Sequence, residues 1–140
     1  MRTARNLASS LTVAAFVAVA IGSSSEKQVE TEIANVPAAV TVSAKDLFED
    51  YKANEIAADQ KYKDKVLEVT GIVDSIAKDI TDTMYVALKA DQYIGSIQCY
   101  FDDAHGGQLA NLKKGMKVSV KGKCVGKMMN VLLKGCVLVR

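Results

Sequence analysis

The sequence predicts a mainly β domain: a small barrel of five strands, with a helix before the first strand and a short helix between the third and fourth. Three observations point to this class. The hydrophobic period changes from helical to alternating near residue 65, five alternating segments follow, and Gly71 stands in the middle of the first. The 140 residues, 49% apolar and 24% charged, suit one globular domain with an appendage.

The first 22 residues have the layout of a secretory signal peptide. Arg2 and Arg5 precede an uncharged apolar run from Leu11 to Gly22, and small residues follow. The run is shorter than the roughly 20 apolar residues that a membrane span needs. We therefore expect an exported protein of the periplasm or cell envelope, without a transmembrane domain once the signal is cleaved. An uncleaved N-terminal anchor is the alternative.

Residues 23–42 are predicted to be a flexible spacer. They are polar, lack aromatic residues and show no sustained period, although an extended piece near Val40 to Val42 is expected. The folded domain is predicted over residues 43–140.

The domain is expected to begin with a helix. Ser43 is a suitable N-cap, with Asp46 three residues later, and Leu47, Phe48 and Tyr51 then follow at helical spacing. Asn54 is a suitable cap for a second helical segment.

Alternating apolar residues predict the five strands. Asp102 or Asp103 can cap a short helix after the third strand, and Gly115 suits its C-terminal stop. A helix in that position, between the third and fourth of five strands, is the order of an OB-fold barrel. The predicted strands are, approximately, residues 66–80, 84–89, 94–101, 116–125 and 131–139.

Gly71 fits this barrel. The first strand of a small closed barrel is long and sharply coiled, because it pairs with the second strand at one end and the fourth at the other. A central glycine permits the bulge or bend that this path requires.

Three segments carry a resemblance to a known family: SAKDLFEDYKANEIAADQKYKDKVLEVTGIVDSI, IQCYFDD and LKKGMKVSVKGKCVGKMMNVLLKGC. Together they resemble the tRNA_anti-like family of small bacterial OB-fold proteins, over about residues 43–140. The resemblance implies an OB-fold and no catalytic motif. Family members often carry secretion or lipoprotein signals; here no cysteine follows the apolar run, so the lipoprotein form is not expected.

Charge is distributed unevenly. The formal net charge is +2, and without Arg2 and Arg5 the chain is neutral. Residues 23–112 hold all 16 acidic residues and 8 lysines, whereas residues 113–140 hold seven lysines and Arg140 with no acid. This asymmetry indicates either an anion-binding face or acidic and basic strands that neutralise one another across the sheet.

Because an exported protein can form disulfides, the three cysteines are candidates for a bridge. A hairpin between strands four and five places Cys124 opposite Leu133 and leaves Cys136 out of its reach. Since strand three pairs with strand five in an OB barrel, the favoured bridge is Cys99–Cys136, with Cys124 as a buried apolar residue. The alternative is that all three are reduced core cysteines.

Enzymatic chemistry is not expected. His105 is the only histidine, so neither a clustered zinc site nor a histidine-based nucleophile pair can be assembled. Phosphate-binding glycine motifs are absent from the sequence. We therefore predict a protein that is not an enzyme and has no metal or cofactor.

The candidate ligand surface is the face of strands two and three, where OB-folds stack bases on aromatic rings. Acidic residues flank these strands, and the mature chain is neutral, which disfavours phosphate binding. We therefore predict a non-catalytic binding module of the bacterial cell envelope whose unidentified ligand is a protein, a glycan or a small anion. Single-stranded nucleic acid, bound on this face and the loop between strands four and five, is the alternative. The candidate residues are Tyr85, Lys89, Gln98, Tyr100, Lys121, Lys123 and Lys127.

Overall fold

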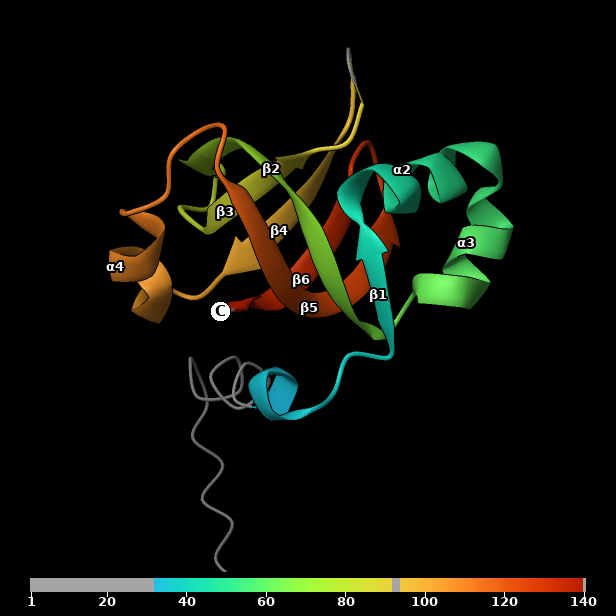
Figure 1. Ribbon diagram of the computed structural model, residues 1–140, viewed down its shortest axis with the longest axis horizontal. Helices are drawn as coiled ribbons and strands as arrows, with labels where there is room; N and C mark the ends of the chain where they lie inside the picture. Colours follow the sequence, from blue (N-terminus) through green and yellow to red (C-terminus); the bar gives the residue numbers. More distant parts are fainter. Residues whose placement is uncertain (1–31, 92–93, 140) are drawn as a thin grey trace, which may run out of the picture.

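Five strands close into a barrel in the computed structural model, which describes residues 32–91 and 94–139. The sheet order is β1-β2-β3-β4-β6-β5, and pairing of β2 with β5 closes the barrel (Figure 1). The predicted OB-fold is confirmed, with one additional strand. The barrel strands are β2 (Val66–Lys78), β3 (Met84–Lys89), β4 (Ser96–Phe101), β5 (Lys117–Lys127) and β6 (Val131–Val139).

Two helices lie between β1 and the first barrel strand, and both start where the sequence predicts. Helix α2 (Ala44–Ala53) begins after Ser43, whose hydroxyl accepts a hydrogen bond from the Asp46 amide at 3.0 Å. Helix α3 (Glu55–Tyr62) begins after Asn54, whose side chain accepts from the Ala57 amide at 3.0 Å. These bonds satisfy amide groups that the first helical turn leaves without partners.

A short helical segment lies at the other side of the barrel, between β4 and β5 (Figure 1). It comprises η1 (Asp103–His105), capped by Asp102, and α4 (Gly106–Leu109), whose Leu109 is buried in the core. The predicted stop at Gly115 is wrong, because the helix ends at Leu109. Gly115 has φ of 94° and donates its amide to the Val73 carbonyl at 2.8 Å.

The additional strand is β1 (Val40–Ser43), which pairs in parallel with β2 from Val40–Leu67 to Ser43–Thr70. It covers the part of β2 that β3 does not reach, so this edge is not left open. The expected extended piece near Val40 to Val42 is confirmed, but it belongs to the sheet rather than to a spacer. Residues 32–35 are helical, and Ile33 is buried.

The predicted signal peptide, residues 1–22, lies outside the described residues. Within residues 32–91 and 94–139, no helix has the length and apolar character that crossing a membrane requires.

Gly71 has a different role from the predicted one. The register shift in β2 lies between Val73 and Ser75, beyond the glycine. A Cβ atom on Gly71 would lie 2.9 Å from the Ala44 Cβ and 3.2 Å from the Leu88 Cβ. Gly71 therefore lets α2 and β3 approach the strand closely, and the bulge that follows redirects the strand.

The predicted Cys99–Cys136 disulfide is not formed in the structure, where the three cysteines are buried thiols. The strand pairing is as expected, with β4 beside β6 and Cys124 opposite Leu133. However, the partner of Cys99 is also Leu133, three residues before Cys136. Cys136 instead lies against Gly122, where an added Cβ would be 2.5 Å from its sulfur.

Candidate ligand-binding faces of the barrel

The outward face of β3 and β4 brings together four of the predicted residues. Tyr85 is the direct partner of Tyr100, and their ring centroids are 5.6 Å apart at an angle of 44°. The Tyr100 hydroxyl donates to Gln98 Oε1 at 3.2 Å, and Lys89 lies further along β3 on the same face. Both rings are partly exposed. We call this surface the tyrosine face.

One end of the tyrosine face is acidic. In the β2–β3 loop, the Asp79 carboxylate accepts hydrogen bonds from the Thr81 hydroxyl, at 2.7 Å, and from the Thr81 and Thr83 amides. The bond from the Thr81 hydroxyl is the main reason why the pKa of Asp79 is lowered. Burial and then the Asp79 charge raise the pKa of Tyr100, which keeps the phenol neutral. A phosphate group would meet electrostatic repulsion here.

The remaining predicted residues are not on this face. Lys121 and Lys123 pair with Glu68 and Val66 of β2, so they project outward from β5. Strands β2 and β6 separate β5 from β3 and β4 on either side of the barrel. The prediction that Lys121 and Lys123 share one face with the tyrosines is therefore wrong, because closure of the barrel turns β5 away from the tyrosine face.

Lys127 lies at the end of β5 that is near α2. Its ammonium group is 5.9 Å from the centroid of the Phe48 ring, which is close enough for a cation–π contact. Lys127 is therefore placed against the helix that covers this end of the barrel, and it does not extend the tyrosine face.

A second surface, which we call the basic face, consists of the outward lysines Lys117, Lys121 and Lys123 of β5 and Lys134 of β6. Lys123 and Lys134 are direct cross-strand partners. This pairing lies between the two register shifts of the β5–β6 ladder, and Gly135, with φ of 63°, follows Lys134. The surplus of lysine is visible in the sequence, but its separation from the tyrosine face depends on closure of the barrel and has no local signal.

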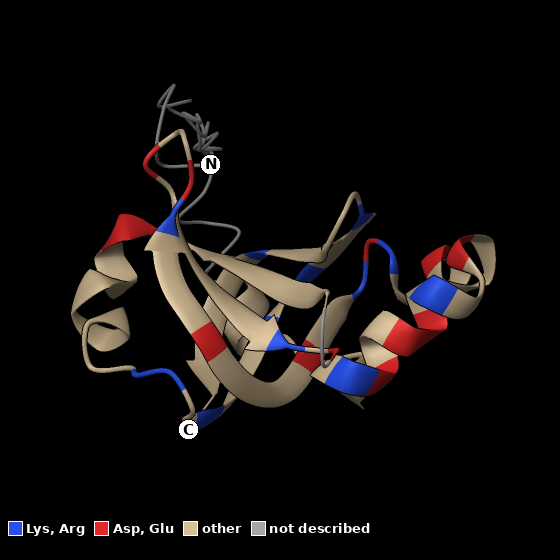
Figure 2. Ribbon diagram, turned by 90° about the horizontal axis from the view of Figure 1, so that it is seen from above, with Lys and Arg blue, Asp and Glu red and all other residues tan. Residues whose placement is uncertain are grey.

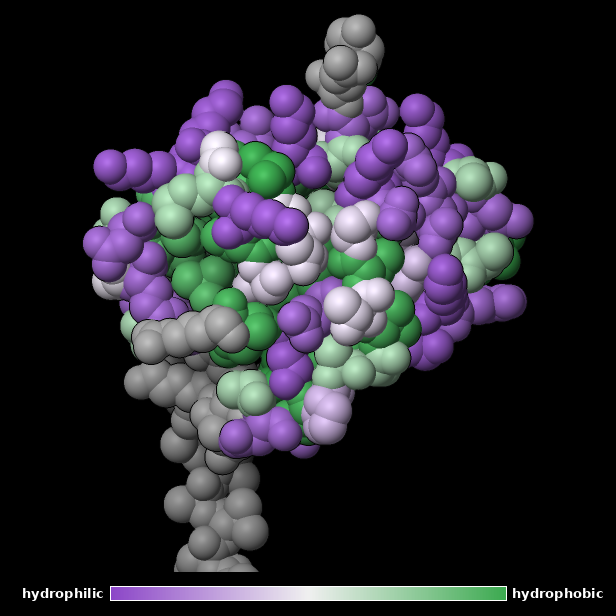
Figure 3. Space-filling model, in the orientation of Figure 1, coloured by the Kyte–Doolittle hydropathy of each residue, from purple (hydrophilic) through white to green (hydrophobic). Residues whose placement is uncertain are grey.

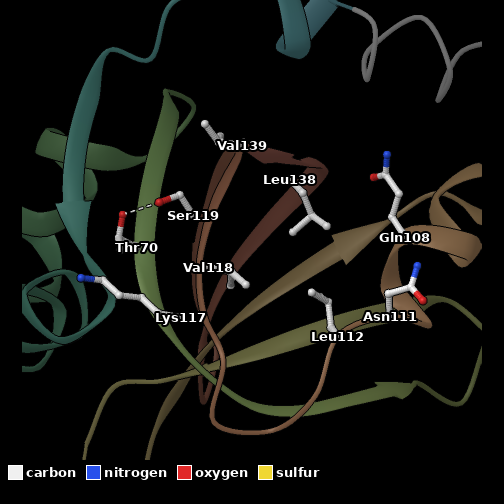
Figure 4. A pocket seen from close by; sticks show the side chains of 9 residues that line it. All are labelled: Thr70, Gln108, Asn111, Leu112, Lys117, Val118, Ser119, Leu138 and Val139. Atoms are coloured by element: carbon white, nitrogen blue, oxygen red, sulfur yellow. Dashed lines mark hydrogen bonds between the residues drawn. The ribbon is translucent and has the colours of Figure 1, made fainter.

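A groove of about 560 Å³ opens between α4 and the strands β2, β5 and β6 (Figure 4). Figure 3 shows apolar side chains gathered between α4 and β5 on this side of the molecule. The groove was not predicted, since segments far apart in the chain contribute to it and none has a local signal in the sequence. It is lined by Thr70, Gln108, Asn111, Leu112, Lys117, Val118, Ser119, Leu138 and Val139.

Most polar groups of the groove already have partners within the protein. The Thr70 and Ser119 hydroxyls are 2.7 Å apart and hydrogen-bonded, and Asn111 donates to the Gly107 carbonyl at 3.1 Å. The Gln108 side chain lies 3.3 Å from His105 Nδ1. The groove thus combines aliphatic side chains with polar groups that already have internal partners, and it offers few free groups for selective recognition.

A buried polar contact connects the helices to the barrel. The Tyr51 hydroxyl donates to the Asp59 carboxylate at 3.0 Å and lies 3.5 Å from the Cys124 sulfur. Burial raises the pKa of both the Tyr51 phenol and the Cys124 thiol, so both stay neutral at physiological pH. Neutral buried groups of this kind stabilise packing and are poor nucleophiles.

No cluster of three or more His, Cys, Asp or Glu side chains suited to a metal ion occurs in the part of the chain that the structure describes.

The fold and the tyrosine face define a member of the class of small OB-fold barrels. The chain belongs to the tRNA_anti-like family, whose model matches residues 1–137. The resemblance found in the sequence is thereby confirmed.

Among solved structures, the chain is similar to a putative nucleic acid-binding lipoprotein from Klebsiella pneumoniae subsp. pneumoniae MGH 78578. The TM-score is 0.58 at 17% identity, and the match covers 71% of this chain and 91% of that one. The OBody AM3L09, bound to hen egg-white lysozyme, matches with a TM-score of 0.43 at 13% identity, over 57% of this chain and 86% of its own. No curated protein matches the sequence.

Proposed function

We propose that this protein is a non-catalytic binding module of the bacterial cell envelope that holds its ligand on the tyrosine face. The observation that carries the proposal is the pair of partly exposed rings, Tyr85 and Tyr100, at directly opposed positions of β3 and β4. Such a pair offers a broad apolar platform with polar edges. The layout of residues 1–22 and the name of the Klebsiella lipoprotein support the envelope location.

The ligand class that suits this platform is an uncharged glycan. A sugar ring has an apolar face that can lie on an aromatic ring, and its hydroxyls need donors and acceptors at the edge. Gln98 and Ser96 of β4 supply an amide and a hydroxyl group, and Asp79 supplies a carboxylate near Tyr100. An uncharged ligand is not repelled by this acidic end.

Single-stranded nucleic acid is the second candidate. It is favoured by the position of the tyrosines on the strands where OB-folds stack bases. The charge distribution opposes it, because affinity for phosphates comes from lysine and arginine. Lys89 lies on the tyrosine face, whereas Lys121 and Lys123 lie on β5.

Calorimetric titration of the full chain with N-acetylglucosamine oligomers tests the proposal. Tyr85→Ala and Tyr100→Ala should each weaken binding about tenfold, since stacking on one ring contributes about 1–3 kcal/mol. Lys123→Ser, on β5, is the matched control and should bind normally.

A thymidine oligonucleotide is titrated in parallel. Glycan binding that both tyrosine variants retain, or no glycan binding at all, would contradict the proposal. Oligonucleotide binding that weakens with salt and is lost in the tyrosine variants would favour the second candidate instead.

A further inference from the structure

The basic face carries more positive charge than the acidic residues beside it compensate. Among the described residues, the ion pairs involve other lysines, and none involves Lys117, Lys121, Lys123 or Lys134. Lys121 donates to the Ala34 carbonyl at 3.4 Å, a neutral acceptor. Lys123 and Lys134 are both exposed and directly opposed, a pairing of like charges that destabilises a sheet. An anionic partner over both ammonium groups would relieve this repulsion.

The acidic residues are gathered mainly elsewhere. Many occur on α2, on α3, in the loop of the β2–β3 hairpin and at η1 (Figure 2), whereas Asp64, Glu68 and Asp74 lie on or next to β2. On β2, the strand beside the basic face, Glu68 lies opposite Lys121, but the partners of Lys117 and Lys123 are Ile72 and Val66. The expectation that acidic and basic strands neutralise one another therefore holds at one pair and fails at its neighbours.

The character of this face fits a lipid surface better than a nucleic acid strand. Lys121 and Lys123 are alternate residues of one strand, so their Cα atoms are about 7 Å apart, and Lys134 adds charge on the adjacent strand. Val137 and Val139 of β6 are the partners of Lys121 and Ser119. The outward residues of β5 and β6 include no aromatic ring on which a base could stack. Lysines among aliphatic side chains suit the boundary between headgroups and water.

The chain also enters the fold at this face. Ala34 lies next to Lys121, and nine residues, 23–31, separate Glu32 from the apolar run that ends at Gly22. Nine residues span at most about 32 Å when fully extended. An apolar run held in a membrane would therefore keep the basic face within reach of the bilayer.

We propose that the basic face docks on an anionic lipid bilayer and thereby orients the barrel, with the tyrosine face directed away from the membrane. The inference rests on the envelope location in the proposed function and is independent of the ligand of the tyrosine face. Each lysine near an anionic surface strengthens binding about fivefold, and the attraction falls as salt screens it.

Residue-by-residue labelling of lysines on the full chain tests the docking. An amine-reactive reagent is applied with vesicles of phosphatidylcholine alone or with one third phosphatidylglycerol, and modification rates are read by mass spectrometry. On anionic vesicles, modification of Lys117, Lys123 and Lys134 should slow relative to neutral vesicles in proportion to the fraction of protein that is bound. Lys45 on α2 is the internal control and should be modified at the same rate on both. The assay is informative even when the N-terminal run inserts into both kinds of vesicle.

Two variants complete the experiment. Lys123→Ser/Lys134→Ser should abolish the protection of Lys117, whereas Lys45→Ser/Lys52→Ser, with the same change in net charge, should keep it. Tyr85→Ala should also keep it, which separates this proposal from the ligand of the tyrosine face. Equal labelling on both kinds of vesicle, equal protection of Lys45, or protection that survives the β5–β6 double variant would overturn the docking. Displacement from the vesicles by a thymidine oligonucleotide would overturn it in favour of nucleic acid.

Discussion

Asp50 is the residue that joins helix α2 to helix α3. Its carboxylate accepts a hydrogen bond from the Tyr62 hydroxyl at 2.6 Å and from the Lys61 ammonium at 3.1 Å. The Tyr62 bond, followed by the Lys61 bond, lowers the pKa of Asp50. Tyr62 itself is 1% exposed and stacks near Tyr51, so this carboxylate holds a core aromatic residue in place.

This contact predicts a specific dependence of stability on pH. Because the pKa of Asp50 is lower in the folded state, its contribution is complete above about pH 4, the usual pKa of an aspartate, and is lost as the pH falls through the folded value. Tyr62→Phe should cost about 1 kcal/mol at neutral pH, and the difference from wild type should shrink below about pH 4. Urea unfolding measured across this range checks it, with Tyr85→Phe as the control. If Tyr62→Phe lowers the free energy of unfolding by the same amount at about pH 2 as at neutral pH, the bond to the Asp50 carboxylate does not account for the loss.

At the scale of elements, α2, β2 and β3 approach one another closely. It occurs at Gly71, where the Cβ atoms of Ala44 and Leu88 occupy the space that a side chain would need. Ala44 is the first residue of α2, so the glycine sets how near the helix can lie to the barrel.

A double-mutant cycle tests this contact. Gly71→Ala should destabilise the protein by about 1–3 kcal/mol through overpacking. Ala44→Gly alone should cost up to about 1 kcal/mol from its effect on the helix. Because Ala44→Gly removes the nearer of the two clashing atoms, Gly71→Ala should cost about 1 kcal/mol less in that background. Denaturant unfolding of the four proteins measures the coupling; purely additive costs would mean that Gly71 serves β2 alone.

The elements themselves could be predicted because their signals are local. Ser43 and Asn54 cap helices through bonds to amides three residues away, and alternation identifies a strand from its own residues. The register could not be predicted, since it depends on bulges. The register shift near Gly135 places Cys136 beside Gly122, and the adjacent sequence does not specify it.

The placement of the candidate residues was predicted correctly where they lie on adjacent strands and wrongly where they do not. Tyr85 and Tyr100 belong to a hairpin, so their meeting follows from pairing of neighbours in the chain. Lys121 and Lys123 were assigned to the same site by their order along the chain. Closure of β2 on β5 places them on another side, and that is a property of the whole barrel.

At the scale of the whole molecule, the barrel separates two surfaces of different chemistry. The tyrosine face combines partly exposed rings with an acidic end, while the basic face collects lysines without ion pairs among the described residues. A module held to a membrane by one surface can present the other to a ligand. The separation also means that substitutions on one surface should leave the other intact.

The opposed lysines predict that substitutions of Lys134 which raise the free energy of unfolding will weaken docking on anionic lipid. Lys134→Gln removes a like-charge pair, and Lys134→Glu replaces it with an attractive one, so the free energy of unfolding should rise in the order wild type, Gln, Glu, by about 0.5 kcal/mol in all. The gain should diminish at high salt, because both ends of the pair are exposed. Docking on anionic vesicles should weaken in the same order, since each step removes positive charge from the surface that meets the lipid.

Denaturant unfolding and lysine labelling on vesicles measure the two trends, and Lys113→Glu, a loop substitution with the same charge change as Lys134→Glu, is the control. If stability falls from wild type to Glu, the repulsion between Lys123 and Lys134 is not present in solution. If stability rises while docking is unaffected, the repulsion is real but the membrane is not what relieves it.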